Sequence, residues 1–209
     1  MTRHEASFTD VTGGLATAAG ATSSISKTGG MVGGYAGYNW QQRNFVYGIE
    51  GDISWLDAKA QQTWGSLIST IITWQQTQDI TWLATFRGRA GVDIDSTLLY
   101  LTGGLAVGGV KESYNEFCGN VGCFGVGAGA TFAGFTNNTT KVGWTMGAGF
   151  EHMFDPHWTV RGEFRYVDLG RSTVSCANVG IVCGAAGSAL SGVFSNTLMT
   201  RTVGVGYKF

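Results

Sequence analysis

The sequence predicts an all-β fold, an antiparallel up-and-down β-barrel that crosses a membrane. Segments in which apolar and polar side chains alternate with a period of two recur along the chain, and their charges fall on one side. The gaps between these segments are short and long in turn, as in barrels with tight turns at one end. The chain combines 34 Gly with a single Pro, which suits long paired strands because Pro removes a ladder donor.

Composition argues against several other classes of protein. The net charge of −1 gives no indication of a nucleic-acid partner, and seven Trp, seven Tyr and 12 Phe are many for a chain with 13% charged residues. Membrane interfaces favour Trp and Tyr. The longest weakly polar run, 98–110, carries four Gly and fits a strand better than a membrane-spanning helix. No secretory signal follows Met1, so we expect that an export signal has been removed or that the natural start lies upstream.

Seven segments are predicted to be strands. In chain order they are Met31–Gln41, Phe45–Asp57, Asp79–Asp93, Thr97–Glu112, Thr140–Phe154, Trp158–Gly170 and Thr197–Phe209. Each is long enough to cross a bilayer at a tilt, which takes about 9–11 residues. Residues 42–44, 94–96 and 155–157 have tight-turn compositions. Residues 58–78, 113–139 and 171–196 are rich in Gly, Ser, Thr, Ala and Asn, and we expect long loops there.

Alternation within the strands assigns one face to lipid and the other to the barrel lumen. In 45–57 the lipid face carries Phe45, Tyr47, Ile49, Ile53 and Trp55. In 79–93 it carries Ile80, Trp82, Ala84, Phe86, Ala90 and Val92. In 140–154 the lipid face carries Val142, Trp144, Met146, Ala148, Phe150 and Phe154. In 158–170 it carries Trp158, Val160, Phe164 and Tyr166. The last strand contributes Val203, Val205, Tyr207 and Phe209.

Aromatic side chains on the lipid face gather at the two ends of the strands. Near the short-turn end lie Trp40, Phe45, Tyr47, Phe154, Trp158, Tyr207 and Phe209. Near the long-loop end lie Trp55, Trp82, Trp144 and Tyr166. Two aromatic girdles of this kind mark the two interfaces of an outer-membrane barrel.

The lumen face carries equal numbers of acids and bases. The acids are Glu50, Asp52, Glu151 and Glu163, and the bases are Arg87, Arg89, Arg161 and Arg165. Counted from the nearest short turn they lie at similar heights, with Glu50 beside Arg87 and Glu151 beside Arg161 on adjacent strands. A barrel of about eight strands has room only for side chains. We therefore favour a self-neutralising plug, and a charged selective pore is the alternative.

The four cysteines fall in two predicted outer loops, on the oxidising side of the membrane. Local disulfides Cys118–Cys123 and Cys176–Cys183 are favoured, and pairings between the loops remain open. A four-cysteine zinc site is disfavoured because these spacings miss the usual CxxC pattern. We predict no metal and no cofactor.

Two other features of the sequence are candidate sites. His152 has lipid-facing parity, and no Ser lies at its height on the flanking strands, so we predict no catalytic residue. Segment Ser66–Trp74 has five apolar side chains in a region expected to face water. It is predicted either to pack on neighbouring loops or to form a contact surface for another protein or for lipopolysaccharide.

Several motifs resemble strands of the small opacity-type outer-membrane β-barrel family of Gram-negative bacteria. They are Gly34–Gln41, Tyr47–Asp52, Arg87–Gly91, Leu98–Gly104, Gly143–Glu151, Arg165–Tyr166 and Val203–Phe209. The resemblance runs from about Met31 to Phe209 and implies an eight-stranded barrel, structural or antigenic rather than catalytic. The terminal Phe209 is similar to the signal read by the barrel assembly machinery.

Residues 1–30 depart from the family's pattern, because they lack a first strand rich in Gly and aromatic residues. Seven strands are clear, whereas single-chain bacterial barrels have even numbers. The favoured interpretation is that 1–30 is mainly the first outer loop, that the first strand is missing, and that the barrel occupies 31–209. A degenerate strand near Glu5–Gly14 is the alternative.

These observations predict a non-enzymatic outer-membrane barrel that supports envelope integrity and displays loops outside the cell. Its expected partners are outer-membrane lipid and lipopolysaccharide, the assembly machinery, and a surface partner bound through the loops. The alternatives are a narrow porin for small solutes and a loop-mediated adhesion or binding protein.

Overall fold

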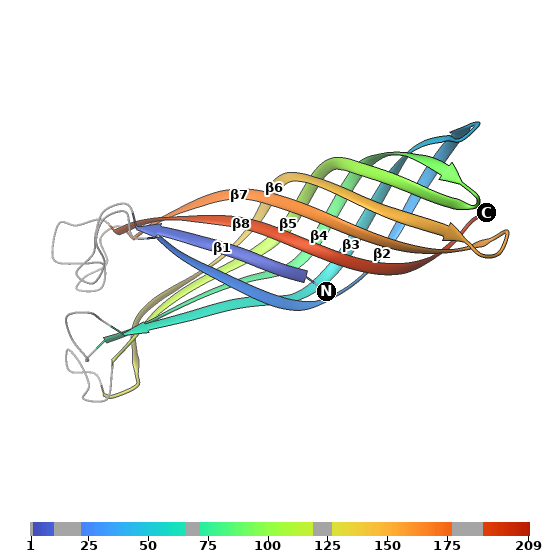
Figure 1. Ribbon diagram of the computed structural model, residues 1–209. Helices are drawn as coiled ribbons and strands as arrows, with labels where there is room; N and C mark the ends of the chain where they lie inside the picture. The colour runs from blue at the N-terminus through green and yellow to red at the C-terminus, as the bar shows by residue number, and fades with distance from the viewer. Residues whose placement is uncertain (1, 11–21, 66–71, 119–126, 177–189) are drawn as a thin grey trace.

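Eight antiparallel strands, adjacent in chain order, close into one barrel (Figure 1). The computed structural model describes residues 2–10, 22–65, 72–118, 127–176 and 190–209. The strands are β1 (Thr2–Asp10), β2 (Thr22–Gln42), β3 (Phe45–Gly65), β4 (Ile72–Ile94), β5 (Thr97–Cys118), β6 (Thr131–Met153), β7 (Trp158–Cys176) and β8 (Leu190–Tyr207). In the described part of the chain, no helix is long and apolar enough to cross a membrane. The predicted fold class is confirmed.

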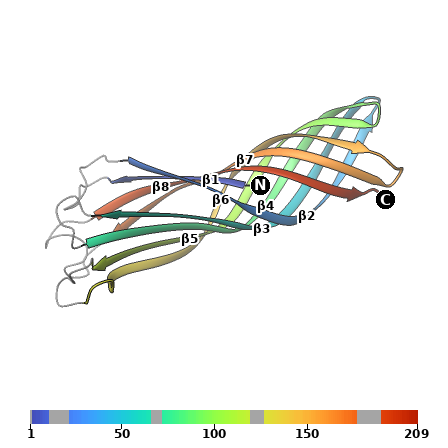
Figure 2. The same ribbon diagram turned by 60° about the horizontal axis from the view of Figure 1, so that its bottom comes forward.

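Tight turns join the strands at the end of the barrel where the C-terminus lies (Figure 2). Asp95 and Ser96 both have positive φ, 48° and 68°, as the turn between two twisted antiparallel strands requires. Arg43 has φ 56° in the turn between β2 and β3. At the third turn, Trp158 N–H donates to the Asp155 carbonyl at 3.2 Å. The predicted short gaps are therefore the turns of the barrel.

The strands are much longer than the sequence pattern indicated. The expected loop 58–78 contains the end of β3 and the start of β4, which stay paired from Ala58↔Ile80 to Gly65↔Thr73. Residues 113–139 and 171–196 likewise contain ends of strands. Lys59, Gln61 and Thr63 are exposed on the outer face of β3. Because this part of the wall has no apolar outer face, the alternation that identified the lower strands stops there.

The first strand is present, so the favoured interpretation of residues 1–30 as mainly a loop is wrong. β1 pairs with β2 from Thr2↔Gly29 to Thr9↔Thr22, and with β8 from Thr2↔Thr200 onward. The alternative, a degenerate strand near 5–14, was close but began three residues late. Hydrogen bonds along both edges form this strand without the apolar periodicity that would reveal it in the sequence.

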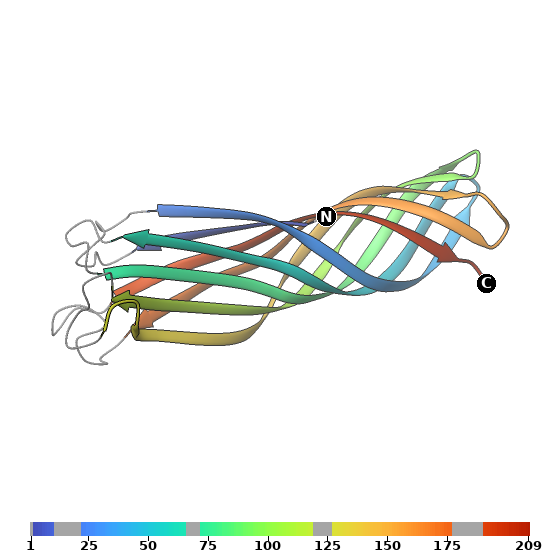
Figure 3. The ribbon, with the colours of Figure 1, turned by 90° about the horizontal axis from the view of Figure 1, so that it is seen from below.

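β1 covers only part of the interval between β2 and β8 (Figure 3). Beyond Thr2, residues 30–42 of β2 pair with β3 and residues 201–207 of β8 pair with β7, with no described strand between them. The Tyr35 ring reaches into this interval from β2, and the Arg161 guanidinium stacks on it at 4.1 Å. A Cβ added to Gly206 would lie 2.5 Å from the Tyr35 hydroxyl oxygen, so a side chain there would displace Tyr35.

Register shifts interrupt the ladders at four places in the described part of the chain. They lie between Glu116 and Phe117 near the end of β5, between Trp55 and Ala58, between Ile80 and Trp82, and between Asp168 and Arg171. At the last of these Gly170 has φ 77° and its N–H donates to the Asp168 carboxylate at 2.8 Å. Bulges bend strands and increase their twist, so the wall bends at these positions.

Candidate functional site

The lower lumen is filled by an ion-pair network centred on Arg87 of β4. Its guanidinium bonds Glu50 and lies 3.1 Å from Asp52 and 2.7 Å from Glu163. The same group donates to the Thr102 hydroxyl at 3.1 Å. Arg87 is 0% exposed. A fully buried guanidinium with three carboxylate partners is tolerated because the partners neutralise its charge and accept its hydrogen bonds.

Two further arginines connect β7 to the opposite wall. Arg161 donates to Glu50 at 2.6 Å and to Glu163 at 2.5 Å. Arg165 donates to both carboxylate oxygens of Asp52, at 2.9 and 3.0 Å. The bonds to Glu50 and Asp52 join residues 111 and 113 positions apart in the sequence and span the lumen from β7 to β3.

The two remaining predicted lumen charges, Arg89 and Glu151, contact each other closer to the turns. Arg89 donates to Glu151 at 2.5 Å, and its guanidinium lies 3.9 Å from the centre of the Tyr100 ring. Glu151 and Arg161 are directly opposite in the ladder, as the sequence indicated. However, Arg161 makes its short contacts with Glu50 and Glu163, because its side chain turns across the lumen.

All eight predicted lumen charges thus lie on the inner wall and are paired, four acids against four bases. The sequence did not identify the neutral groups that complete this network. Tyr100 donates to Glu163 at 3.1 Å, and the Thr85 hydroxyl donates to Asp52 at 2.5 Å. Both residues have the parity of the lumen face, and that parity was the signal available.

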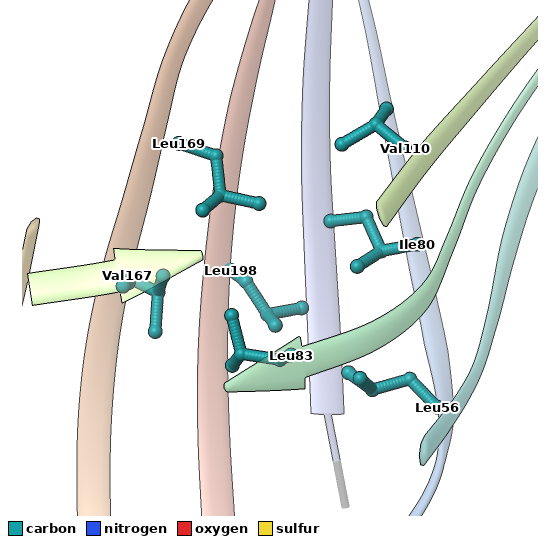
Figure 4. Close-up of a cluster of buried hydrophobic side chains, with 8 residues drawn as sticks. Leu56, Ile80, Leu83, Val110, Val167, Leu169 and Leu198 are labelled. Carbon is teal, nitrogen blue, oxygen red and sulfur yellow. The ribbon is translucent and has the colours of Figure 1, made fainter. Parts of the chain in front are cut away.

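An apolar layer closes the lumen beyond the charged network (Figure 4). The buried residues of this layer are Leu56, Ile80, Leu83, Ala106, Val110, Val167, Leu169 and Leu198, with Met31 packed against them. They come from five strands, β3, β4, β5, β7 and β8. These side chains place an apolar cluster inside the lumen, where water is disfavoured because few polar partners are available to it.

The layer corrects one face assignment. Ile80 was predicted to face lipid with Trp82, yet it is 0% exposed and belongs to the apolar layer. The reason is the bulge between Ile80 and Trp82, which moves Ile80 from the outer to the inner face. Thr81, predicted to face the lumen, is exposed. Beyond the apolar layer, Gln78 donates to the Asn196 side chain.

The predicted girdle residues lie on the outer wall at two heights. At the turn end Trp40 stacks on Tyr47 at 5.7 Å, and Trp158 meets Tyr207 edge-on at 5.2 Å. At the other end Trp55 lies opposite Trp82, and the rings of Trp144 and Tyr166 are 5.4 Å apart. From Phe45 to Trp55 the wall rises roughly 25 Å at the usual strand rise and tilt. This height matches the apolar band of an outer-membrane barrel.

Cys118 ends β5, is buried, and is disulfide-bonded. Cys123 and Cys183 lie outside the described residues, so the pairings Cys118–Cys123 and Cys176–Cys183 stay predictions. We expect the folded protein to take up no alkylating reagent before reduction and four equivalents after it. Cleavage between residues 123 and 176 should then leave the two fragments separate without reductant. Fragments that stay joined would show a disulfide between the loops.

Other candidate chemical groups form no site on the described wall. His152 is exposed on the outer face, with its Nδ1 3.0 Å from the Thr97 hydroxyl. Among the described residues, no group of three or more His, Cys, Asp or Glu is placed to hold a metal ion. Most of segment 66–74 lies outside the described residues. Phe209 is exposed at the C-terminus, with its ring 5.1 Å from Tyr207.

Comparison with known sequences assigns this architecture to a family. The profile of the outer membrane protein beta-barrel domain matches residues 3–209. The chain belongs to this family. It is therefore a bacterial outer-membrane protein, as the resemblance of its strand motifs implied. The apolar band between the two aromatic girdles is its membrane-facing surface.

Curated relatives of this outer-membrane barrel come from two bacterial genera. It is 35% identical over 146 residues to the 31 kDa outer-membrane immunogenic protein of Brucella melitensis, covering 68% of this chain and 55% of that protein. It is 31% identical over 140 residues to the 22 kDa outer membrane protein of Rhizobium leguminosarum, covering 67% and 52%. The chain thus spans about half the length of these relatives.

A 25 kDa outer-membrane immunogenic protein of Brucella abortus is 28% identical over 188 residues, covering 89% of this chain and 68% of that protein. Among solved structures, the attachment invasion locus protein Ail of Yersinia pestis aligns with 96% of this chain and 95% of its own. That alignment has 12% identity and a TM-score of 0.33.

Proposed function

We propose that this protein is a non-enzymatic, non-conducting barrel that supports the outer membrane and displays its outer segment at the cell surface. The observation that carries the proposal is the filled lumen. A neutral ion-pair network lies below an apolar layer that spans the interior. An eight-stranded barrel has an interior just wide enough for side chains, so such a lumen serves as the protein's core.

The length of the strands supports the display role. β3 continues from Trp55, in the outer girdle, to Gly65, which is roughly 25 Å of additional wall. The outer face of this wall is polar, with Lys111 exposed on β5 and Asn138 exposed opposite it on β6. A wall of this kind raises the connecting segments above the membrane. The relatives that are named immunogenic outer-membrane proteins favour the same role.

The non-enzymatic part of the proposal rests on the chemistry of the described residues. The buried carboxylates are bonded to arginines, which occupies their oxygens as hydrogen-bond acceptors. His152 has a threonine hydroxyl for a partner and lies on the outer wall. Neither arrangement presents a nucleophile next to a base at a substrate-accessible place.

Planar-bilayer recording tests the proposal. We expect the purified barrel to insert without discrete conductance steps at moderate voltage, while an open porin of about 16 strands, inserted in the same membrane, gives large steps. Insertion is verified by the resistance of the folded barrel to protease added to the bilayer vesicles. Reproducible conductance steps of constant size, whose number rises with protein concentration, would instead favour the narrow-porin alternative.

A further inference from the structure

One arginine lies on the lipid-facing wall. Arg201 of β8 is exposed on the outer face, directly opposite Phe164 of β7. Its outer-face neighbours include Phe164, 45% exposed, and Val203, 84% exposed. Between the two girdles, it is the one charged side chain on the outer face of the described wall. A charge at this place needs a physical explanation.

The height of Arg201 indicates where its charge resides. Tyr166, in the outer girdle, lies opposite Met199, two residues along β8 from Arg201. An arginine is costly at the bilayer midplane, and this cost falls towards zero at the interface. Arginine avoids this cost by extending its apolar stem along the wall and placing its guanidinium at the headgroup level. Arg201 is the next outward-facing residue of β8 after Met199, so its backbone lies two residues from that level.

A second arginine lies beside it at the girdle. Arg3 of β1 is exposed on the outer face and is directly opposite Met199. Arg3 and Arg201 are therefore diagonal neighbours across β1 and β8, a relationship that places such residues about 7–8 Å apart. Each guanidinium presents five N–H donors in a planar fork. Two guanidiniums at this spacing suit the bidentate recognition of phosphate.

We propose that Arg3 and Arg201 bind the phosphate of an anionic lipid in the outer leaflet. The bound group is the headgroup phosphate of a lipid that also carries acyl chains. The acyl chains lie on the apolar wall formed by Phe164 and Val203, and the phosphate meets the arginines at the height of Tyr166. This inference depends on the outer-membrane location of the barrel and is independent of whether the lumen conducts ions.

Native mass spectrometry of the full chain in detergent tests the site. The probes are diphosphorylated lipid A, the same lipid without phosphates, and inorganic phosphate. We expect lipid A to bind the wild type, and binding to fall roughly fivefold for each arginine replaced in Arg201→Gln and in the double variant with Arg3→Gln. Arg171→Gln is the matched control, because Arg171 is an exposed arginine of β7 beyond the outer girdle.

Two further comparisons keep the result decisive. Arg201→Lys retains the charge but loses the bidentate fork, so its affinity for lipid A should lie between those of the wild type and Arg201→Gln. This variant still reports on the site if the glutamine variants fold poorly. Dephosphorylated lipid should bind the wild type and Arg201→Gln equally weakly. Equal binding of lipid A to the wild type and the double variant would overturn the proposal. Competition by millimolar inorganic phosphate would also overturn it, because the site would then recognise the free anion.

Discussion

Arg87→Ala is expected to lower the free energy of unfolding by about 3–5 kcal/mol, because it removes one partner from a buried ion-pair network. The side chain is fully buried and contacts Glu50, Asp52 and Glu163. Without it, three carboxylates share the lower lumen with fewer cations. Equilibrium unfolding by urea in lipid vesicles, followed by tryptophan fluorescence, measures the change.

The control for this prediction is Arg171→Ala. Arg171 is an exposed arginine on the outer face of β7, so its removal should change stability by less than about 0.5 kcal/mol. If Arg87→Ala instead left unfolding unchanged and produced a large steady conductance, Arg87 would be a gate in a pore. The filled-lumen account would then fail.

Leu83→Ala should produce the second largest loss, about 3–5 kcal/mol. Leu83 is 0% exposed in the apolar layer of the lumen. Shortening it removes buried apolar atoms and leaves a cavity, because side chains from other strands hold the surrounding layer in place. The same urea titration measures this loss.

Leu105→Ala is the matched control, since Leu105 is 60% exposed on the lipid face. Lipid chains fill the space left by this change, so only the transfer term of about 1–2 kcal/mol is lost. Equal losses of unfolding free energy for Leu83→Ala and Leu105→Ala would show that the space left at Leu83 is refilled by its surroundings. That result would contradict a rigidly packed layer.

The sequence predicted the membrane-embedded half of the barrel well, because lipid imposes a strict pattern there. Between Phe45 and Trp55 the outer face must be apolar and the inner face polar, so parity alone assigns both. Glu50 and Arg87 could be placed side by side for the same reason, and the ladder pairs them directly.

The outer half could not be predicted in this way, for a physical reason. Beyond Trp55 water replaces lipid on the outer face, so residues such as Lys59 and Gln61 carry no apolar alternation. The same holds for β1, whose strand conformation depends on hydrogen bonds to β2 and β8. Strand pairing over long sequence separations leaves little local signal when both faces are polar.

Local irregularities account for the remaining errors. The bulge beside Ile80 reverses the inside and outside faces within one strand, and nothing in the residue types announces it. The partners of Arg161 were also unpredictable in detail. Cross-strand position indicates Glu151, but the long side chain reaches Glu50 on the far wall, and only three-dimensional packing determines that choice.

A double-mutant cycle between Glu50 and Arg161 tests the central claim most directly. These residues lie on β3 and β7 and bond across the lumen at 2.6 Å. Unfolding free energies of the wild type, Glu50→Gln, Arg161→Met and the double variant give their coupling. A filled, water-free lumen predicts a coupling of about 1.5–3 kcal/mol. A coupling below about 0.5 kcal/mol, as expected for solvated charges in a hydrated pore, would contradict the account.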